Sequence, residues 1–184
     1  MPDAETVAQS AARSSRGWGP VPEAVWSPLA GSFLVLLPGL FGLAVGRPLL
    51  FASLGPTLYI QVAQPQHPTS RFYNVVLGHL VGFAAATGAV LLLGAADDPS
   101  AFGAKHLPPA RVWASVLAVA AALLVGVPLR VAFHPPAAAT TLLVTLGGFR
   151  PTWSDFLTVA AGVLIVAVAG EVIRRLRLAQ PGQK

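Results

Sequence analysis

The stretch GVPLRVAFHPPAAATTLLVTL, residues 126–146, carries the strongest structural signal in the chain. Its adjacent prolines, Pro135 and Pro136, remove two backbone donors and prevent a helix from running through them. The residues that follow, Ala137 to Leu146, predict a helix, and prolines suit its first turn, where backbone donors lack helical partners in any case. The stretch therefore predicts a helix that begins abruptly after His134, inside an apolar region.

A related stretch, GRPLLFASLGPT, occupies residues 46–57. When the chain is shifted against itself by 80 residues, matching residues coincide without a gap: Gly46 with Gly126, Pro48 with Pro128, Pro56 with Pro136, and Gly82 with Gly162. Some matches are expected by chance in a chain rich in Ala, Leu and Gly, but coincident prolines are less easily explained that way. We interpret the pattern as an internal duplication with halves at about 28–96 and 108–176.

The composition points to a membrane protein. The 184 residues are 54% hydrophobic and only 10% charged, whereas soluble domains average about 25% charged residues. This balance argues against an ordinary soluble enzyme and against a disordered protein. The net charge of +5 is carried at the ends of the apolar segments, so it indicates membrane topology rather than nucleic-acid binding. The chain has no cysteine, which excludes disulfides and thiolate metal sites.

Four apolar segments are long enough to span a bilayer, which takes about 20 helical residues; they lie at about 28–46, 73–96, 110–129 and 153–175. Two shorter segments, about 49–63 and 131–148, are interrupted near their starts by Pro and Gly. We therefore predict an all-α polytopic membrane protein with four long transmembrane helices and two short broken helices. Each half would be long helix, broken helix, long helix.

Two topologies remain open at this point. If the short elements cross the membrane, each half crosses three times and the second half is inverted; if they only dip in and out, the halves are parallel. Both alternatives place the termini on one side, and the arginines near the C-terminus favour the cytoplasm of a bacterial-type plasma membrane. We expect residues 1–27 to be a flexible cytoplasmic tail and 176–184 a basic one, around a single membrane domain at 28–175.

The broken helices are the candidate functional site. A helix interrupted inside a membrane frees backbone groups that lipid cannot satisfy, so these groups must face protein or a water-filled cavity. A helix N-terminus there has partial positive charge and free N–H groups, which suit an anion. The predicted path residues are Ser53, Gly55, Pro56, Thr57, His134, Pro135, Pro136, Thr140 and Thr141. We expect His134 to face a polar cavity within reach of Ser53–Thr57.

Five further residues are predicted to support the path: Arg47, Arg71, Asn74, His79 and Arg130. The alternatives are structural: both breaks could be packed helix ends, His79 a bond between helices whose Gly78 and Gly82 allow close packing, and the arginines anchors to headgroups. The sequence contains none of the enzyme motifs that we sought, and no histidine is spaced from another ligand as a metal site requires. We expect no enzymatic activity, no metal and no cofactor.

Three motifs in order give the chain a resemblance to a known family: Ala52 to Thr57, Arg71 to Asn74 leading to His79, and Phe133-His134-Pro135-Pro136-Ala137. Across about residues 28–175 it resembles the HPP family of integral membrane proteins, which is described as having four transmembrane helices. Some members are similar to nitrite transporters of plastids and cyanobacteria. The resemblance implies a small-anion permease and makes nitrite a candidate substrate.

The sequence as a whole thus predicts a permease or channel for a small inorganic anion, acting through a midplane site between the two broken helices. The rival interpretation is a membrane protein that transports nothing and serves as an assembly or sensing partner. Because one short chain offers a thin wall around a path, we expect a homodimer in the lipid bilayer, and no nucleic-acid partner.

Overall fold

The structure, a computed structural model, describes residues 21–103, 106–130 and 134–180. Its elements in chain order are α2 (Glu23–Val45), α3 (Leu54–Ala63), the short 3-10 helix η1 (Pro68–Ser70), α4 (Phe72–Leu92), α5 (Pro109–Gly126), α6 (Pro135–Thr145) and α7 (Trp153–Leu178). The described residues contain no strand. Helices α2, α4, α5 and α7 are long and apolar enough to cross a membrane, so the predicted class of four long and two short helices is confirmed.

The first and last described helices of the chain are longer than the sequence predicted. Helix α2 begins at Glu23, inside the expected tail, and α7 continues to Leu178, inside the expected basic tail. The reason is a contact between these ends: Arg177 donates to Glu23 at 2.6 Å, and its guanidinium lies 5.4 Å from the Trp26 ring centroid. The remaining tail residues, 1–20 and 181–184, lie outside the described residues.

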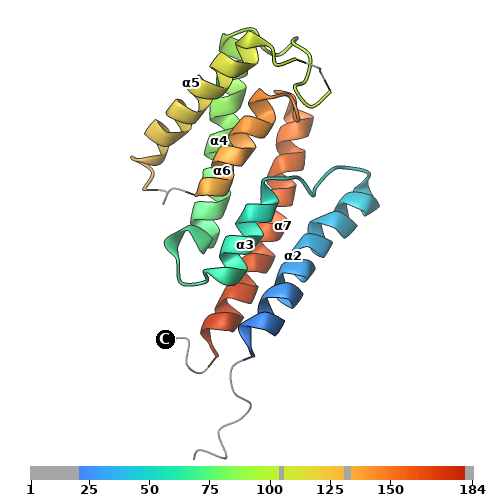
Figure 1. The fold of residues 1–184 in the computed structure, drawn as a ribbon, viewed down its shortest axis with the longest axis vertical. Helices are drawn as coiled ribbons and strands as arrows, with labels where there is room; N and C mark the ends of the chain where they lie inside the picture. The colour runs from blue at the N-terminus through green and yellow to red at the C-terminus, as the bar shows by residue number, and fades with distance from the viewer. Residues whose placement is uncertain (1–20, 104–105, 131–133, 181–184) are drawn as a thin grey trace, which may run out of the picture.

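Helices α4 and α7 form the centre of the bundle (Figure 1). Helix α4 packs against α5, α6 and α7, while α7 packs against α2, α3 and α4. Successive helices run in alternating directions, so α2–α3–α4 and α5–α6–α7 have opposite senses (Figure 1). The set of major helix contacts is unchanged when the two halves are exchanged, as an inverted repeat requires. The duplication itself stays a prediction.

The first broken segment crosses the whole bundle alongside α7. At its start Arg47 donates to Ser154, at the N-terminal end of α7. Further on Gln61 packs against Gly170, and at its end the Pro65 carbonyl accepts from Arg174 Nη1 at 3.1 Å. The chain thus enters without helical structure and leaves as α3. The ten residues of α3 span about 15 Å, half of a hydrocarbon core of about 30 Å.

The second broken segment runs alongside α4 and parallel to it, so its direction is opposite to that of the first broken segment. The Leu129 carbonyl accepts from Tyr73 at the start of α4, and α6 then packs on Gly78 and Gly82. A Cβ on Gly82 would lie 2.8 Å from the Ala137 carbonyl oxygen, a distance that packed atoms do not tolerate. The predicted role of these glycines in close packing is confirmed.

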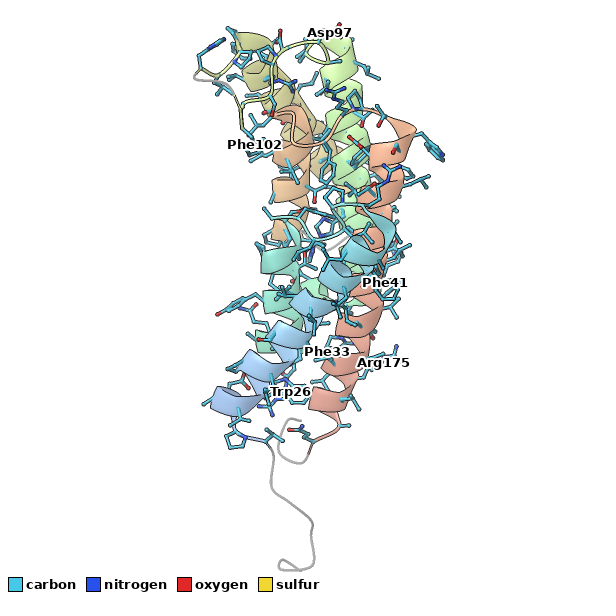
Figure 2. The ribbon with its side chains drawn as sticks, turned by 90° about the vertical axis from the view of Figure 1, so that its right-hand side faces the viewer. Trp26, Phe33, Phe41, Asp97, Phe102 and Arg175 are labelled. Carbon is cyan, nitrogen blue, oxygen red and sulfur yellow. The ribbon has the colours of Figure 1, made fainter. Side chains whose placement is uncertain are left out.

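The bundle has distinct ends. The connection between α4 and α5, with Asp97 and Phe102, lies at one end, while Trp26 and Arg175 lie toward the other (Figure 2). Large apolar side chains, including Phe33 and Phe41, are exposed on the outer face of α2. Such a surface suits lipid rather than water.

Candidate functional site

The two half-length helices meet at their N-terminal ends. Ser53 precedes α3 and His134 precedes α6 as their N-cap residues, and the two helices run in opposite directions from this point (Figure 1). The Ser53 hydroxyl lies 2.7 Å from the Thr140 hydroxyl, and the Thr57 hydroxyl lies 3.4 Å from Nε2 of His134. Each helix therefore contacts the first turns of the other.

His79 of α4 completes the contact between the two ends. Its Nε2 lies 2.8 Å from the Thr57 hydroxyl and its Nδ1 lies 2.5 Å from the Thr140 hydroxyl. Its ring meets the His134 ring edge to face, with centroids 5.2 Å apart. We call Ser53, Thr57, His79, His134 and Thr140 the tip network; all five are at most 5% exposed. Three helices thus bring five buried polar side chains together.

The backbone fixes the proton on His134. Its Nδ1 lies 2.9 Å from the Thr69 carbonyl oxygen, and a carbonyl only accepts, so Nδ1 carries the hydrogen. In the neutral ring Nε2 is then an acceptor, and the single hydrogen of the Thr57 hydroxyl serves either this nitrogen, at 3.4 Å, or the Ser53 carbonyl oxygen, at 3.1 Å. The Thr69 carbonyl therefore selects the tautomer with the hydrogen on Nδ1 whenever His134 is neutral.

The remaining hydrogens of the tip network follow from this one. Because Thr57 uses its only hydrogen for one of these two acceptors, it accepts from His79, which must carry its hydrogen on Nε2. His79 Nδ1 then accepts from Thr140, and Thr140 in turn accepts from Ser53. The result is a hydrogen-bond chain with one direction, running from Ser53 through Thr140 and His79 to the Thr57 oxygen.

The backbone at the tip of α6 differs from the expectation. Pro135 and Pro136 have no N–H, and the Ala137 N–H is 2.9 Å from the His134 carbonyl oxygen. The free backbone donors that we predicted for an anion are therefore already used or missing at this end. The prolines that start the helix also remove the groups that would bind.

The tip of α3 is closed in the same way. The Leu54 N–H donates to Phe51 and the Gly55 N–H donates to Ala52, at 3.0 and 3.2 Å. Pro56 has no N–H. At both helix ends, a ligand would therefore form hydrogen bonds with side chains rather than with backbone amides. The helix dipoles would contribute only a positive electrostatic potential.

A cavity of about 110 Å³ lies beside His134, between α4, α5 and α6. Among the described residues that line it, only His134 and Thr141 have polar side chains; the others are aliphatic residues, proline or glycine. The predicted polar cavity is therefore not found here, because α5 contributes Val119, Ala122 and Leu123 to the wall. The space is enough for a few water-sized groups, each taking about 30 Å³ in the liquid.

The supporting residues lie apart from the tip network, with the exception of His79. Asn74 donates to the Pro68 carbonyl at 2.8 Å and so holds η1, which carries Thr69. Arg47 lies at the N-terminal end of α7, where it donates to Ser154. Arg71 is the exposed N-cap residue of α4, and Arg130 is exposed in the turn after α5, with a φ of 51°.

Other buried polar residues went unpredicted. Gln61 is fully buried, and its amide has no hydrogen-bond partner among the described residues. Together with Ser53 and Thr57 it forms a row spaced by four residues along α3, a spacing that the sequence contained. Thr69 acts through its carbonyl, which no side-chain pattern reveals.

The C-terminal end of α6 is held by Arg111, which is only 4% exposed. Its guanidinium donates to the carbonyls of Thr145 and Pro99, each at 2.8 Å, and to that of Asp98. The Thr145 hydroxyl lies 2.7 Å from that of Ser115. Arg111 thus ties α6 to the connection between α4 and α5.

Comparison with known proteins gives one family. The family description "HPP, transmembrane region" matches residues 18–181, almost the whole chain. Neither the curated proteins nor the solved structures gave a match. The matched region contains all six helices and the tip network described above. With its four long apolar helices and its two opposed half-helices, the chain belongs to the HPP transmembrane family.

Proposed function

We propose that the protein is a membrane permease for a small inorganic anion, with nitrite as the first candidate, which passes between the tips of α3 and α6. The tip network is the observation that supports this proposal. Burying polar groups costs free energy, and polar residues inside membranes usually mark substrate paths. The tip network brings five such residues together from three helices, which favours a functional role over packing alone.

The charge pattern favours an anion over a cation. The N-terminal ends of α3 and α6 both point to the meeting place, and each end carries a partial positive charge of about half an elementary charge. Within the described residues, no carboxylate forms a hydrogen bond with the tip network. Half-helix N-termini directed at an anionic substrate are a recurrent device in transporters.

The described conformation is closed, because Ser53 bonds Thr140 directly. Passage therefore requires the two tips to separate. A neutral hydrogen bond contributes about 0.5–1.5 kcal/mol net. The binding free energy of an ion could therefore offset the loss of a few of these bonds. The network would act as a gate as well as a binding site.

We further propose a homodimer, since α2 and α5 leave broad apolar faces uncovered. The α2 face includes Leu29, Leu36 and Leu43. Lipid alone could cover these faces, so chemical cross-linking in native membranes is the test. A cross-linked species of twice the chain mass supports the dimer, and its absence contradicts it.

The alternative function, a membrane protein that transports nothing, is favoured by one observation. Every described donor and acceptor in the tip network has a partner, and the neighbouring cavity is mostly apolar. This is what a purely structural contact between helix ends would need. Transport and packing therefore make opposite predictions for flux.

Anion flux in liposomes distinguishes the two functions. Purified protein would be reconstituted, and uptake of nitrite, nitrate and chloride compared with protein-free liposomes. We expect nitrite uptake that falls by about tenfold in His134→Ala, equivalent to about 1.4 kcal/mol in the barrier. Gel filtration of each variant checks folding. If the folded protein carries none of the three anions above the background, the proposal is wrong and the structural alternative stands.

A further inference from the structure

The Thr57 hydroxyl has one hydrogen and two acceptors. Its oxygen lies 3.4 Å from Nε2 of His134 and 3.1 Å from the carbonyl oxygen of Ser53, one turn back in the chain. Its oxygen also faces the Nε2 donor of His79 at 2.8 Å. A rotation of this single hydroxyl hydrogen therefore changes the group to which Thr57 donates.

We propose that the tip network binds one proton on Nε2 of His134 and that the anion moves together with it. The proton comes from water and adds to Nε2, which then donates to the Thr57 oxygen. The Thr57 hydrogen turns from His134 to the Ser53 carbonyl, while His79 continues to donate to Thr57. Thus every group keeps a partner, and the network gains one positive charge.

His79 has no equivalent rearrangement. A proton on its Nδ1 would displace the hydrogen that Thr140 donates to it. The only other described partner of the Thr140 hydroxyl is Ser53, which already donates to it in the same chain. If Thr140 turned its hydrogen to the Ser53 oxygen, the Ser53 hydrogen would in turn have no other described acceptor, which is costly in a buried site. His134 is therefore the protonation site, and His79 stays neutral.

Among the described residues, none around His134 carries a countercharge. Of the elements packed around it, α4 supplies His79, η1 is preceded by His67, which bonds Thr69, and α3 supplies hydroxyls. Helix α5 lines the neighbouring cavity with aliphatic side chains. The one described charged residue of α5, Arg111, lies at the C-terminal end of α6, away from His134. A buried charge needs a partner, and an anion entering between the tips is that partner.

This inference rests on the proposed function, since it assigns a co-substrate to the same site. Binding of the anion favours the proton and binding of the proton favours the anion, because coupling between two sites is reciprocal. For a monovalent anion the complex of both is neutral. The protein would then be an electroneutral symporter.

The state of His134 can be measured by nitrogen NMR of histidine-labelled full-length protein in lipid bilayers. Imidazole nitrogen shifts separate the two neutral tautomers from the cation, and His134→Gln assigns the signals. We expect nitrite to raise the proton affinity of His134 by about tenfold, a usual size for coupled sites. His79 should stay neutral, with its hydrogen on Nε2. An unchanged His134, or a proton on His79, overturns the proposal.

Three threonine variants test the rotating hydroxyl. Thr57→Val keeps the shape and removes the hydroxyl, so nitrite should no longer protonate His134; Thr57→Ser should behave as the native protein does. Thr87→Val is the matched control, since the buried Thr87 hydroxyl has no described partner. A native response in Thr57→Val overturns the mechanism.

A pH-sensitive dye inside liposomes separates this inference from the proposed function. Nitrite uptake that acidifies the interior in step, above the protein-free background, supports both. Nitrite uptake without proton movement overturns the coupling and leaves the permease. Coupled binding by NMR with no flux leaves the proton site and overturns the permease.

Discussion

His79 and His134 lie edge to face at the centre of the bundle, with ring centroids 5.2 Å apart and planes inclined at 69°. They come from α4 and from the start of α6, and Thr57 of α3 lies within 3.4 Å of a nitrogen of each. The contact therefore joins three helices from both halves of the chain. The predictions below start from this arrangement.

Replacing His79 should destabilise the protein. His79→Phe keeps an aromatic ring but leaves Thr57 without a donor and Thr140 without an acceptor. Unsatisfied buried groups cost about 1–3 kcal/mol each, so we expect a lower unfolding midpoint in a denaturant titration in detergent micelles. His106→Phe is the control, since His106 is exposed. Equal stability of the two variants would show that the His79 bonds contribute nothing.

The glycines of α4 offer a matched pair. In Gly82→Ala the new Cβ would lie 2.7 Å from the Thr141 hydroxyl and 2.8 Å from the Ala137 carbonyl oxygen, so α6 must move. Overpacking of this kind costs about 1–3 kcal/mol. In Gly88→Ala the Cβ meets nothing within 4 Å, and no loss is expected. Thermal unfolding of both variants checks this, and a tolerated Gly82→Ala contradicts the close packing.

Arg111 should be intolerant even of lysine. Its guanidinium donates to three carbonyls, which one ammonium group cannot reproduce in the same geometry. We expect Arg111→Lys to lose stability and to expose the connection between α4 and α5 to protease. Arg175→Lys is the control, because the Arg175 side chain is 75% exposed. Equal cleavage rates would mean that Arg111 does not hold this connection.

The absence of cysteine makes single-cysteine labelling a clean test of topology. Gln66→Cys and Asp98→Cys should react with a membrane-impermeant maleimide from opposite sides, since the structure places the ends of the two broken segments at opposite ends of the bundle. We expect Gln66 on the cytoplasmic side with the termini. Labelling of both from one side would contradict the crossing of the broken helices.

Much of the fold was predictable because apolar length and proline positions are local signals. Helix α6 begins at Pro135 as the proline pair predicted, and α7 begins at Trp153, where the last long apolar segment was expected to start. The start of α2 was not predictable, because it depends on the distant contact between Glu23 and Arg177.

The site was predictable in part. The residue types on both tips were visible in the sequence, and the structure brings Ser53, Thr57, His134 and Thr140 together. The sequence predicts His79 only as a supporting residue, because no local sequence pattern shows that its helix contacts both tips. The used backbone donors and the apolar cavity wall were also out of reach, because both depend on how α5 and the turns pack.

The most direct test of the account is to tie the two tips together. In the double variant Ser53→Cys with Thr140→Cys, two residues whose hydroxyls lie 2.7 Å apart are placed to form a disulfide on mild oxidation. We predict that cross-linked protein in liposomes carries no nitrite and that reduction restores the flux, while each single variant is insensitive to oxidation. Undiminished flux through fully cross-linked protein would contradict passage between the tips of α3 and α6.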